Sequence, residues 1–288
     1  MRLNNDFNPD MPNEVKLSLK KTLAKITSFK EQDFITRELF DPSMHLLNRK
    51  GKMLRPALVF LSANAMGERC SGFIDLAAAI ELLHVSSLVH DDIIDKGRYR
   101  RGVKAVNSKY GNTAALLTGN ALISKAIHLS ARYGEDVMNE VSSAALRMCA
   151  GELMDYQLQN GASKTSVEMY LKAAELKTAS LIGTSCDIVA TYLGRKSGPM
   201  LYKYGFNIGM AFQIRDDVLD SYRSNGNAAD KANIVSSVAR KYGTTRQAAL
   251  ERSAEMNRRY IRKALAELKG RKESALLEHY AHMLEVQA

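Results

Sequence analysis

Long stretches of helical apolar periodicity constrain the fold of this chain more than any other feature of its sequence. Residues 71–95, 113–134 and 198–220 each carry apolar side chains at i, i+3 and i+4 spacing over several turns. The chain has 5 prolines among 288 residues, so little interrupts these segments. Short alternating runs rich in Val, Ile and Thr, which are typical of strands, are not evident. The sequence therefore predicts an all-α fold, a bundle of long helices without a sheet of any size.

Glycine and proline mark the expected helix ends, at Gly102, Gly134, Gly161 and within residues 194–199. The basic segment 258–288 predicts one or two amphipathic helices that pack on the body of the protein through Leu and Ala, rather than a membrane-binding element. No low-complexity linker divides the chain, and its length fits one large domain. We therefore expect residues 1–288 to form a single all-helical domain.

The net charge of +10 points to an anionic partner, for which nucleic acid, a membrane surface or a phosphorylated substrate would each serve. Cys70, Cys149 and Cys186 are widely spaced and form no CxxC pair, which favours a reducing compartment. The first thirty residues lack a basic stretch followed by an apolar one, and we expect no window of about 18 apolar residues. These features predict a cytoplasmic protein.

Two copies of one acidic pattern, DDxxD, are the strongest chemical signal. Residues 91–95 read DDIID and residues 216–220 read DDVLD, each late in an apolar segment. On a helix the first and last acids share a face and repel each other unless a cation bridges them. Carboxylate oxygens on a semi-rigid support suit Mg²⁺. One copy should arise by chance in about one chain in 25 of this size, and two in about one in a thousand. Two such helices side by side would hold a metal-bound diphosphate between their carboxylates.

Residues suited to diphosphate accompany both acidic segments, because arginine offers a planar fork matched to phosphate oxygens. They are Arg100 and Arg101 after the first segment, Lys52 and Arg55 in GKMLRP, and Lys177 and Thr178 in KTASL. His84 lies seven residues, or two helical turns, before Asp91 and so falls on the same stripe. Together these residues indicate a site for phosphorylated ligands.

In this ordered set the sequence resembles the trans-isoprenyl diphosphate synthases, also called the polyprenyl synthetase family. The resemblance runs through GKMLRP, ELLHVSSLVHDDIID, RRG, GN at 119–120, KTASL and GMAFQIRDDVLD. It implies an all-helical homodimer in which three Mg²⁺ ions hold an allylic diphosphate between two aspartate-rich helices. Isopentenyl diphosphate then adds head to tail, and the released diphosphate accepts the proton.

The resemblance also implies a role for each matched residue. Asp91, Asp95 and Asp216 are expected to bind the metal, while Asp92, Asp217 and Asp220 act through waters or through bonds to the ligands. Lys52, Arg55, His84 and Arg101 are expected to bind isopentenyl diphosphate, and Arg100, Lys177, Thr178 and Gln213 the allylic diphosphate. The family loop after the second acidic segment is shortened here, and Lys231 in DKANIV is its candidate lysine. Both acidic segments are intact, which predicts an active enzyme.

Two other functions stay open. A terpene cyclase or head-to-head synthase shares the fold and the metal but needs no site for a second diphosphate. A non-enzymatic protein that binds nucleic acid or another anionic surface would gather basic and aromatic residues on one face, whereas acids are mixed into most of the predicted helices here. A head-to-tail prenyl diphosphate synthase without a nucleic-acid partner is therefore favoured, with a product able to associate with a membrane.

The residues just before the first acidic segment bear on product length. In the family a growing chain runs beside this helix, and bulky residues before the acids form its floor in farnesyl-producing members. Ser86 and Ser87 are small, so the floor should lie one or two turns back, within residues 79–83. Each turn adds about 5.4 Å, close to one extended isoprene unit. This predicts products of geranylgeranyl length or longer.

Overall fold

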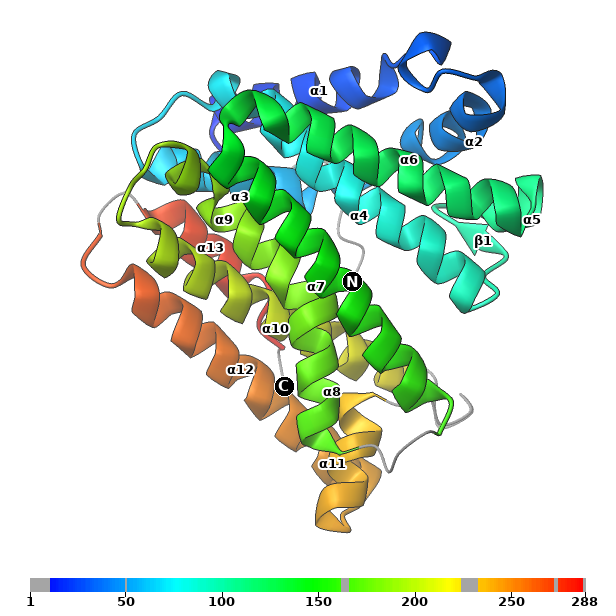
Figure 1. Ribbon diagram of the computed structural model, residues 1–288. Coiled ribbons are helices and arrows are strands. Elements are labelled where there is room, and N and C mark those ends of the chain that lie inside the picture. Colours follow the sequence, from blue (N-terminus) through cyan, green and yellow to red (C-terminus); the bar gives the residue numbers. More distant parts are fainter. Residues whose placement is uncertain (1–10, 50, 162–165, 224–232, 272–273, 287–288) are drawn as a thin grey trace. The chain divides into compact units, whose positions relative to one another are not determined.

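The all-α prediction is confirmed. The computed structural model describes residues 11–49, 51–161, 166–223, 233–271 and 274–286 (Figure 1). Within these ranges nearly all regular structure is helical, and the strands are β1 (Tyr99–Arg100) and β2 (Val103–Lys104), which pair as one antiparallel hairpin. The chain divides into two compact units, Met1–Ser142 with Ile188–Gly194, and Ser143–Asp187 with Arg195–Ala288. The expectation of a single domain stays a prediction.

The first unit contains the hairpin, nine helical elements and parts of two more among its described residues. The nine elements are α1 (Asn13–Thr27), η1 (Glu31–Asp33), α2 (Arg37–Leu47), α3 (Leu54–Ala65), η2 (Cys70–Phe73), α4 (Ile74–Ile94), α5 (Val106–Tyr110), α6 (Asn112–Ser130) and η3 (Ala131–Tyr133). The start of α7 (Glu135–Gln159) and the end of α9 (Ser180–Tyr192) complete it.

Helix α4 is the core of the first unit, because α1, α3 and α6 all pack against it. Its residues from Leu76 to Leu83 are buried, including three consecutive alanines, whose small side chains allow close packing. Cys70–Ile94 is long and apolar enough to cross a membrane, so the expectation that no such segment occurs is wrong. However, 67% of its most apolar window is buried inside the structure. Packing on several sides by other helices accounts for this composition.

Helices α4 and α6 run side by side (Figure 1). A Cβ atom at Gly119 of α6 would lie 2.1 Å from Nε2 of His90 on α4. The same nitrogen is 3.2 Å from the carbonyl oxygen of Leu116. Gly119 therefore provides the space in which the His90 ring crosses between the two helices.

The predicted helix ends agree with the structure at all but one position. Gly134 and Gly161 follow the ends of η3 and α7 with positive φ, and residues 193–197 separate α9 from α10. Gly102 is the exception, since it lies in the turn of the hairpin and not at the end of a helix. The two-residue turn needs positive φ at both central positions, and Arg101 and Gly102 supply it, at 50° and 78°.

The second unit contains the rest of α7 and α9 and five further helices or helical turns among its described residues, besides the π-helical turn η4 (Glu175–Ala179). They are α8 (Val167–Ala174), α10 (Gly198–Arg223), α11 (Ile234–Tyr242), α12 (Arg246–Leu268) and α13 (Ala275–His282), with a short turn at Ser274 before α13. Because α8, η4 and α9 follow one another without a break, they form one continuous helical segment with a π turn inside it.

Two glycines let α10 pack closely on the segment that contains η4. A Cβ atom at Gly209 would lie 2.5 Å from Cα of Ala179, and one at Gly205 would lie 2.7 Å from the carbonyl oxygen of Ile182. On another side α10 packs against α12, whose residues Ala264 and Leu268 are buried. The predicted C-terminal helices and their packing through Ala and Leu are thus confirmed.

Candidate active site

The first acidic segment lies at the C-terminal end of α4. Asp95 caps the helix, and its backbone N–H donates to the carbonyl oxygen of Asp91 at 2.8 Å. Asp92 is buried, Asp91 is half-buried and Asp95 is exposed. The C-terminal end of a helix carries partial negative charge, so three carboxylates there repel both the helix dipole and one another. The arrangement favours binding of a cation.

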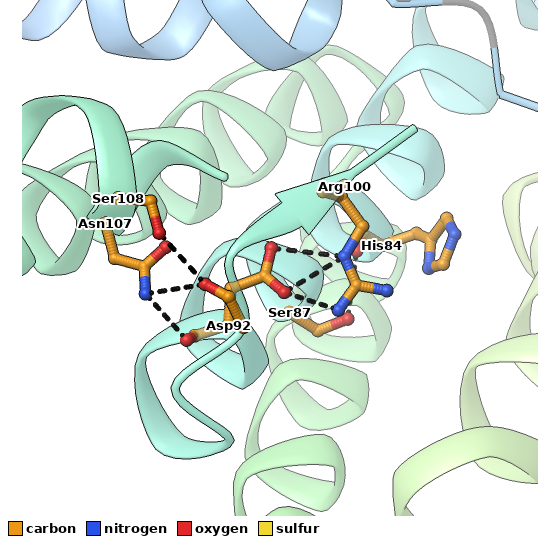
Figure 2. Close-up of polar contacts among 7 residues, drawn as sticks. His84, Ser87, Asp92, Arg100, Asn107 and Ser108 are labelled. Atoms are coloured by element: carbon orange, nitrogen blue, oxygen red, sulfur yellow. Dashed lines mark hydrogen bonds and ion pairs between the residues drawn. The ribbon is translucent and has the colours of Figure 1, made fainter. Parts of the chain in front are cut away.

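The Asp92 carboxylate forms an ion pair with Arg100 of strand β1 (Figure 2). The guanidinium donates from Nε to both carboxylate oxygens at 3.1 Å and from a terminal nitrogen to Oδ1 at 2.6 Å. This pairing raises the pKa of Arg100, because hydrogen bonds to Asp92 favour its charged form. Asp92 therefore orients Arg100, whereas Asp91 and Asp95 are the more accessible acids of the segment.

Asn107 of α5 fixes the turn that follows α4 (Figure 2). Its amide nitrogen donates to the carbonyl oxygens of Asp92 at 2.8 Å and Gly97 at 3.1 Å, and Ser108 also donates to Gly97 at 3.2 Å. The Asp92 carbonyl also accepts the Gly97 backbone N–H at 2.8 Å, so these bonds tie both ends of the turn to α5. Sequence reasoning missed Asn107, because no spacing rule connects a single Asn to an acidic segment fifteen residues earlier.

Arg101 occupies the hairpin turn in a left-handed backbone conformation that non-glycine residues rarely adopt. Its guanidinium donates to Oε1 of Glu81 at 3.3 Å and to the carbonyl oxygen of Arg49 at 3.1 Å. A Cβ atom at Gly51 would lie 2.6 Å from this guanidinium, so the GKMLRP segment passes directly beside it. Two distant segments of the first unit, one at Arg49 and Gly51 and the other α4 at Glu81, therefore meet Arg101.

Glu81 is the buried counter-charge of this cluster, with 2% of its surface exposed. Burial raises the pKa of its carboxyl, and the charges of Arg101 and Arg55 oppose that effect. Sequence reasoning missed Glu81, although a lone acid inside an apolar helix ten residues before Asp91 was a usable signal.

His84 lies among these cations. Removal from water lowers its pKa well below the ordinary value, and the charges of Arg55, Arg101 and Arg100 lower it further. The ring is therefore neutral at neutral pH in this structure. Lys52 is exposed on the same segment as Arg55. The predicted residues Arg55, His84, Arg100 and Arg101 are thus brought together in the first unit, where their positive potential suits an anion.

The second acidic segment lies late in α10, and its three acids differ in their surroundings. Asp217 accepts hydrogen bonds from the Tyr170 hydroxyl at 2.6 Å, the Ile234 backbone N–H at 3.1 Å and the Gln213 amide at 3.0 Å. Burial raises the pKa of its carboxyl, while these three donors favour the charged form. Asp220 is exposed and pairs with Arg223 at 3.1 Å, and Asp216 is half-buried.

The turn η4 places Lys177 and Thr178. The Thr178 hydroxyl donates to Oε1 of Gln213 at 2.9 Å. Lys177 Nζ lies 2.6 Å from Glu152 and 2.8 Å from Asp155, both on α7. Thr178, Gln213 and Asp217 thus form one hydrogen-bonded series, with Lys177 held by two carboxylates beside it.

Glu152 and Asp155 are further residues that sequence reasoning missed. They lie three residues apart directly after Gly151, whose Cβ atom, if present, would lie 2.2 Å from the backbone nitrogen of Lys177. A glycine inside an otherwise regular helix, followed by acids at i+1 and i+4, was the available signal. The predicted residue Lys231 lies outside the described residues, so its role stays a prediction.

The acids present fit Mg²⁺ that is shared with a substrate. Within the described ranges no group of three or more His, Cys, Asp and Glu side chains is arranged to hold a metal ion by itself. Mg²⁺ does not need such a group, because it is typically held by one or two carboxylates, several waters and substrate phosphates. Asp91 and Asp95 at the negative end of α4 meet that requirement. The two acidic segments belong to different units, and the cavity expected between them stays a prediction.

Comparison with known proteins gives one family whose match includes residues of both units. The sequence model described as Polyprenyl synthetase matches residues 36–283. The chain is 36% identical over 212 residues to geranylgeranyl pyrophosphate synthase of Geoglobus acetivorans, which is 69% of this chain and 66% of that protein. It is 31% identical over 185 residues to heptaprenyl diphosphate synthase component 2 of Bacillus subtilis, 63% of this chain and 53% of that protein.

The chain thus spans less than two thirds of the length of these curated relatives in sequence alignment. The structural similarity covers more of the chain than the sequence alignments do. A solved structure of the geranylgeranyl pyrophosphate synthetase of Geoglobus acetivorans superposes with a TM-score of 0.84 and 28% identity, covering 96% of this chain and 99% of that one.

Proposed function

The chain belongs to the polyprenyl synthetase family, and from this we propose that it is a Mg²⁺-dependent trans-prenyltransferase. It condenses isopentenyl diphosphate head to tail with an allylic diphosphate and makes a trans-polyprenyl diphosphate of geranylgeranyl length or longer. The single observation that carries this proposal is the cationic cluster around Glu81. Arg55 and Arg101 flank that buried acid beside His84, while the neighbouring Arg100 is paired with a different acid, Asp92.

The pairing of Arg100 and Arg101 with two different acids favours a synthase over a terpene cyclase. A cyclase binds one diphosphate and has no use for a second cationic group. Here the group around Glu81 suits isopentenyl diphosphate, which we assign to Lys52, Arg55, His84 and Arg101. The allylic diphosphate is assigned to Arg100, Lys177, Thr178 and Gln213. Nucleic acid is an unsuited partner, because acids neutralise several of these cations at short range.

We assign Asp91, Asp95 and Asp216 as Mg²⁺ ligands, with three ions as the family resemblance implies. Bound Mg²⁺ would neutralise the charge that develops on the departing diphosphate. The protein's own part is to hold donors in place before that charge appears, which costs no rearrangement during the reaction. Asp92 does this for Arg100, and Gln213 does it for Thr178.

The reaction needs no catalytic base from the protein. The allylic C–O bond breaks and its electron pair leaves with the diphosphate. The π electrons of the isopentenyl double bond then form the new C–C bond. The resulting cation loses a proton to the released diphosphate, which regenerates a double bond. His84, neutral in this structure, serves as a hydrogen-bond donor to diphosphate in this scheme.

The surroundings of Ser86 and Ser87 support the proposed product length. Ser86 is buried and donates its hydroxyl to the carbonyl oxygen of Leu83 at 2.7 Å, and the Ser87 hydroxyl donates to the backbone carbonyl oxygen of His84 at 2.9 Å. Both hydroxyls are thus satisfied within α4 and add little polarity to an apolar path beside the helix. Residues 79–83, the deeper floor, are all buried. Geranylgeranyl and heptaprenyl synthases are among the named relatives.

We further propose a cytoplasmic homodimer whose product associates with membranes. All three cysteines are free thiols, Cys149 being exposed, which fits a reducing compartment. The dimer follows the family resemblance. The relative named as a component 2 makes a two-subunit assembly the alternative outcome.

The decisive experiment incubates the purified protein with Mg²⁺, isopentenyl diphosphate and farnesyl diphosphate, followed by chromatography of the dephosphorylated products. Asp91→Ala and Asp216→Ala should each lower turnover by orders of magnitude with unchanged helicity. Asp41→Ala, which removes an exposed acid paired with Arg37 on α2, is the matched control. Product formed from the allylic diphosphate without isopentenyl diphosphate would instead identify a cyclase. Near-normal turnover of either acidic-segment variant would show that the metal assignment is wrong.

A further inference from the structure

Tyr170 contacts the second acidic segment from outside it. Its ring is 5% exposed, on α8, among apolar side chains that include Val167, Ile214 and Val218. Its hydroxyl donates to Oδ2 of Asp217 at 2.6 Å, a short distance of the kind found when a hydroxyl donates to a charged carboxylate. In such apolar surroundings a hydrogen bond is electrostatically stronger than it would be in water.

Asp217 is the meeting point of three helices. Oδ2 receives the Tyr170 hydroxyl from α8 and the Ile234 backbone N–H at the first residue of α11, and Oδ1 receives the Gln213 amide from α10 itself. Protein donors thus engage both carboxylate oxygens. Asp217 therefore acts on ligands through its neighbours rather than through direct coordination.

Those neighbours are groups assigned above to the ligands. The side-chain oxygen of Gln213 accepts the Thr178 hydroxyl at 2.9 Å, while its amide nitrogen donates to Asp217. One continuous series of hydrogen bonds therefore links Tyr170, Asp217, Gln213 and Thr178. Asp216 precedes Asp217 directly on α10. A rotation of the Asp217 side chain would release the Gln213 amide and loosen the end of α10 that carries Asp216.

We propose that Tyr170 is a positioning residue for the second acidic segment: it fixes the Asp217 carboxylate and so aligns Asp216 and Gln213 for a Mg²⁺-bound diphosphate. This inference rests on the proposed function for the identity of the ligand. The Tyr170 hydroxyl on α8 thus sets the affinity of the second acidic segment for Mg²⁺-bound diphosphate, although α8 itself contributes no ligand.

The test replaces Tyr170 by Phe, which keeps the ring and removes the hydroxyl. Calorimetric titration of inorganic diphosphate at a series of Mg²⁺ concentrations should show that the variant needs about 10- to 100-fold more Mg²⁺ for half-maximal binding, as for other residues that orient metal ligands. In turnover, the same variant should raise KM for the allylic diphosphate more than it lowers kcat at saturating Mg²⁺. KM for isopentenyl diphosphate should change little.

Tyr204→Phe is the matched control. Tyr204 lies on α10 in the same unit, is fully buried, and donates its hydroxyl to the carbonyl oxygen of Leu277 at the same 2.6 Å. Loss of this bond should lower stability but leave the Mg²⁺ dependence of diphosphate binding unchanged. Equal weakening of binding by both variants would assign Tyr170 a purely structural role and overturn the proposal.

A double-mutant cycle with Asp217→Asn tests whether Tyr170 acts through Asp217. If it does, Tyr170→Phe should have little further effect in the Asp217→Asn background. Additive effects, or wild-type Mg²⁺ dependence of Tyr170→Phe, would overturn the inference. If Tyr170→Phe failed to fold, Asp217→Asn alone would carry the test, since it keeps the side-chain shape and must show the same rise in Mg²⁺ requirement. Failure of the proposed function would appear differently, as a wild-type protein that binds Mg²⁺ and diphosphate yet forms no prenyl product.

Discussion

At the scale of single residues, Arg101 combines backbone strain with a buried partner. Its left-handed conformation costs roughly 1–2 kcal/mol relative to a right-handed one for a side chain with a Cβ atom. Glycine would remove that cost but could not reach Glu81. The two-residue hairpin turn requires this conformation. The contact with Glu81, rather than the strain, supports the assignment of Arg101 to isopentenyl diphosphate.

Arg101→Ala should raise KM for isopentenyl diphosphate about 10- to 100-fold, the equivalent of losing a charge-assisted hydrogen bond of about 1.5–3 kcal/mol. KM for the allylic diphosphate should rise much less. Initial rates with each substrate varied in turn measure both constants. Arg98→Ala, an exposed arginine before the same hairpin, is the control and should be nearly silent. Equal changes in both constants would contradict the separation of the two sites.

His84 makes stability depend on pH. Because its pKa in the folded protein lies below the ordinary value, the unfolded chain binds more protons as pH falls below about 6.5. The contribution of His84 to the free energy of unfolding should therefore be constant above that pH and decrease below it, by up to about 1.4 kcal/mol per pH unit. Urea unfolding at pH 7.5 and 5.5 should show a smaller loss for His84→Gln than for wild type. His128→Gln, on the exposed face of α6, is the control. An unchanged loss in His84→Gln would exclude His84 as the cause.

At the scale of elements, the sequence predicts regular helices well and their interruptions poorly. The long helices α4, α6 and α10 follow from apolar periodicity, which depends on nearby residues alone. The predicted helix end at Gly102 is a hairpin turn instead, because a glycine signals several kinds of turn. No local sequence pattern predicts the π turn η4, whose backbone at Lys177 lies directly against Gly151 of another helix. Glu152 and Asp155 were missed because their role depends on that contact between helices, whereas the DDxxD segments are local strings that sequence can reveal.

Gly119→Ala should destabilise the packing of α4 against α6. The new methyl group would clash with the His90 ring, and overpacking of this kind typically costs 1–3 kcal/mol. Urea unfolding should detect this loss, and His90→Ala in the same chain should recover part of it. Gly72→Ala is the control, because a Cβ atom there meets nothing within 4 Å. A neutral Gly119→Ala would mean that the ring moves aside freely.

Ser86→Phe should shorten the product, because its ring would block the path beside α4 about one turn above residues 79–83. Ser86→Ala should leave product length unchanged, since the lost hydroxyl bonds only to its own helix at Leu83. Chromatography of dephosphorylated products measures both. Helicity and initial rate with a short allylic starter show whether Ser86→Phe remains folded. An unchanged longest product in a folded variant would refute the small-floor argument.

At the scale of the whole molecule, one family spans both units, and each unit contributes one acidic segment with its own basic partners. Each unit also balances its charges locally, with Asp92 and Glu81 against arginines in the first and Glu152 and Asp155 against Lys177 in the second. Composition gives the total of +10 but not this pairing, because pairing depends on which segments meet. The sequence therefore predicts an anionic ligand but not how the cations are held before it binds.

The homodimer proposed above should depend on an exposed apolar face. Leu116 and Leu117 of α6 are 51% and 49% exposed. Adjacent exposed leucines of this kind often mark a surface that contacts another protein. Leu116→Glu with Leu117→Glu should shift the sedimentation of the protein from dimer toward monomer. Leu17→Glu, a 53% exposed leucine on α1, is the control. A monomeric wild-type protein would contradict the homodimer and favour a two-component assembly.

The π turn η4 has a consequence for changes in chain length. A π turn contains one residue more than the α-helical turn it replaces, so η4 is equivalent to a one-residue insertion in a continuous helix from Val167 to Tyr192. Deletion of one residue from Glu175–Ala179 would restore a regular helix but rotate the part before the turn by about 100° relative to the part after it. Lys177 and Tyr170 could not then both keep their partners, Asp155 and Asp217. A family member that lacks this extra residue must therefore hold its lysine and its second acidic segment by a different set of contacts.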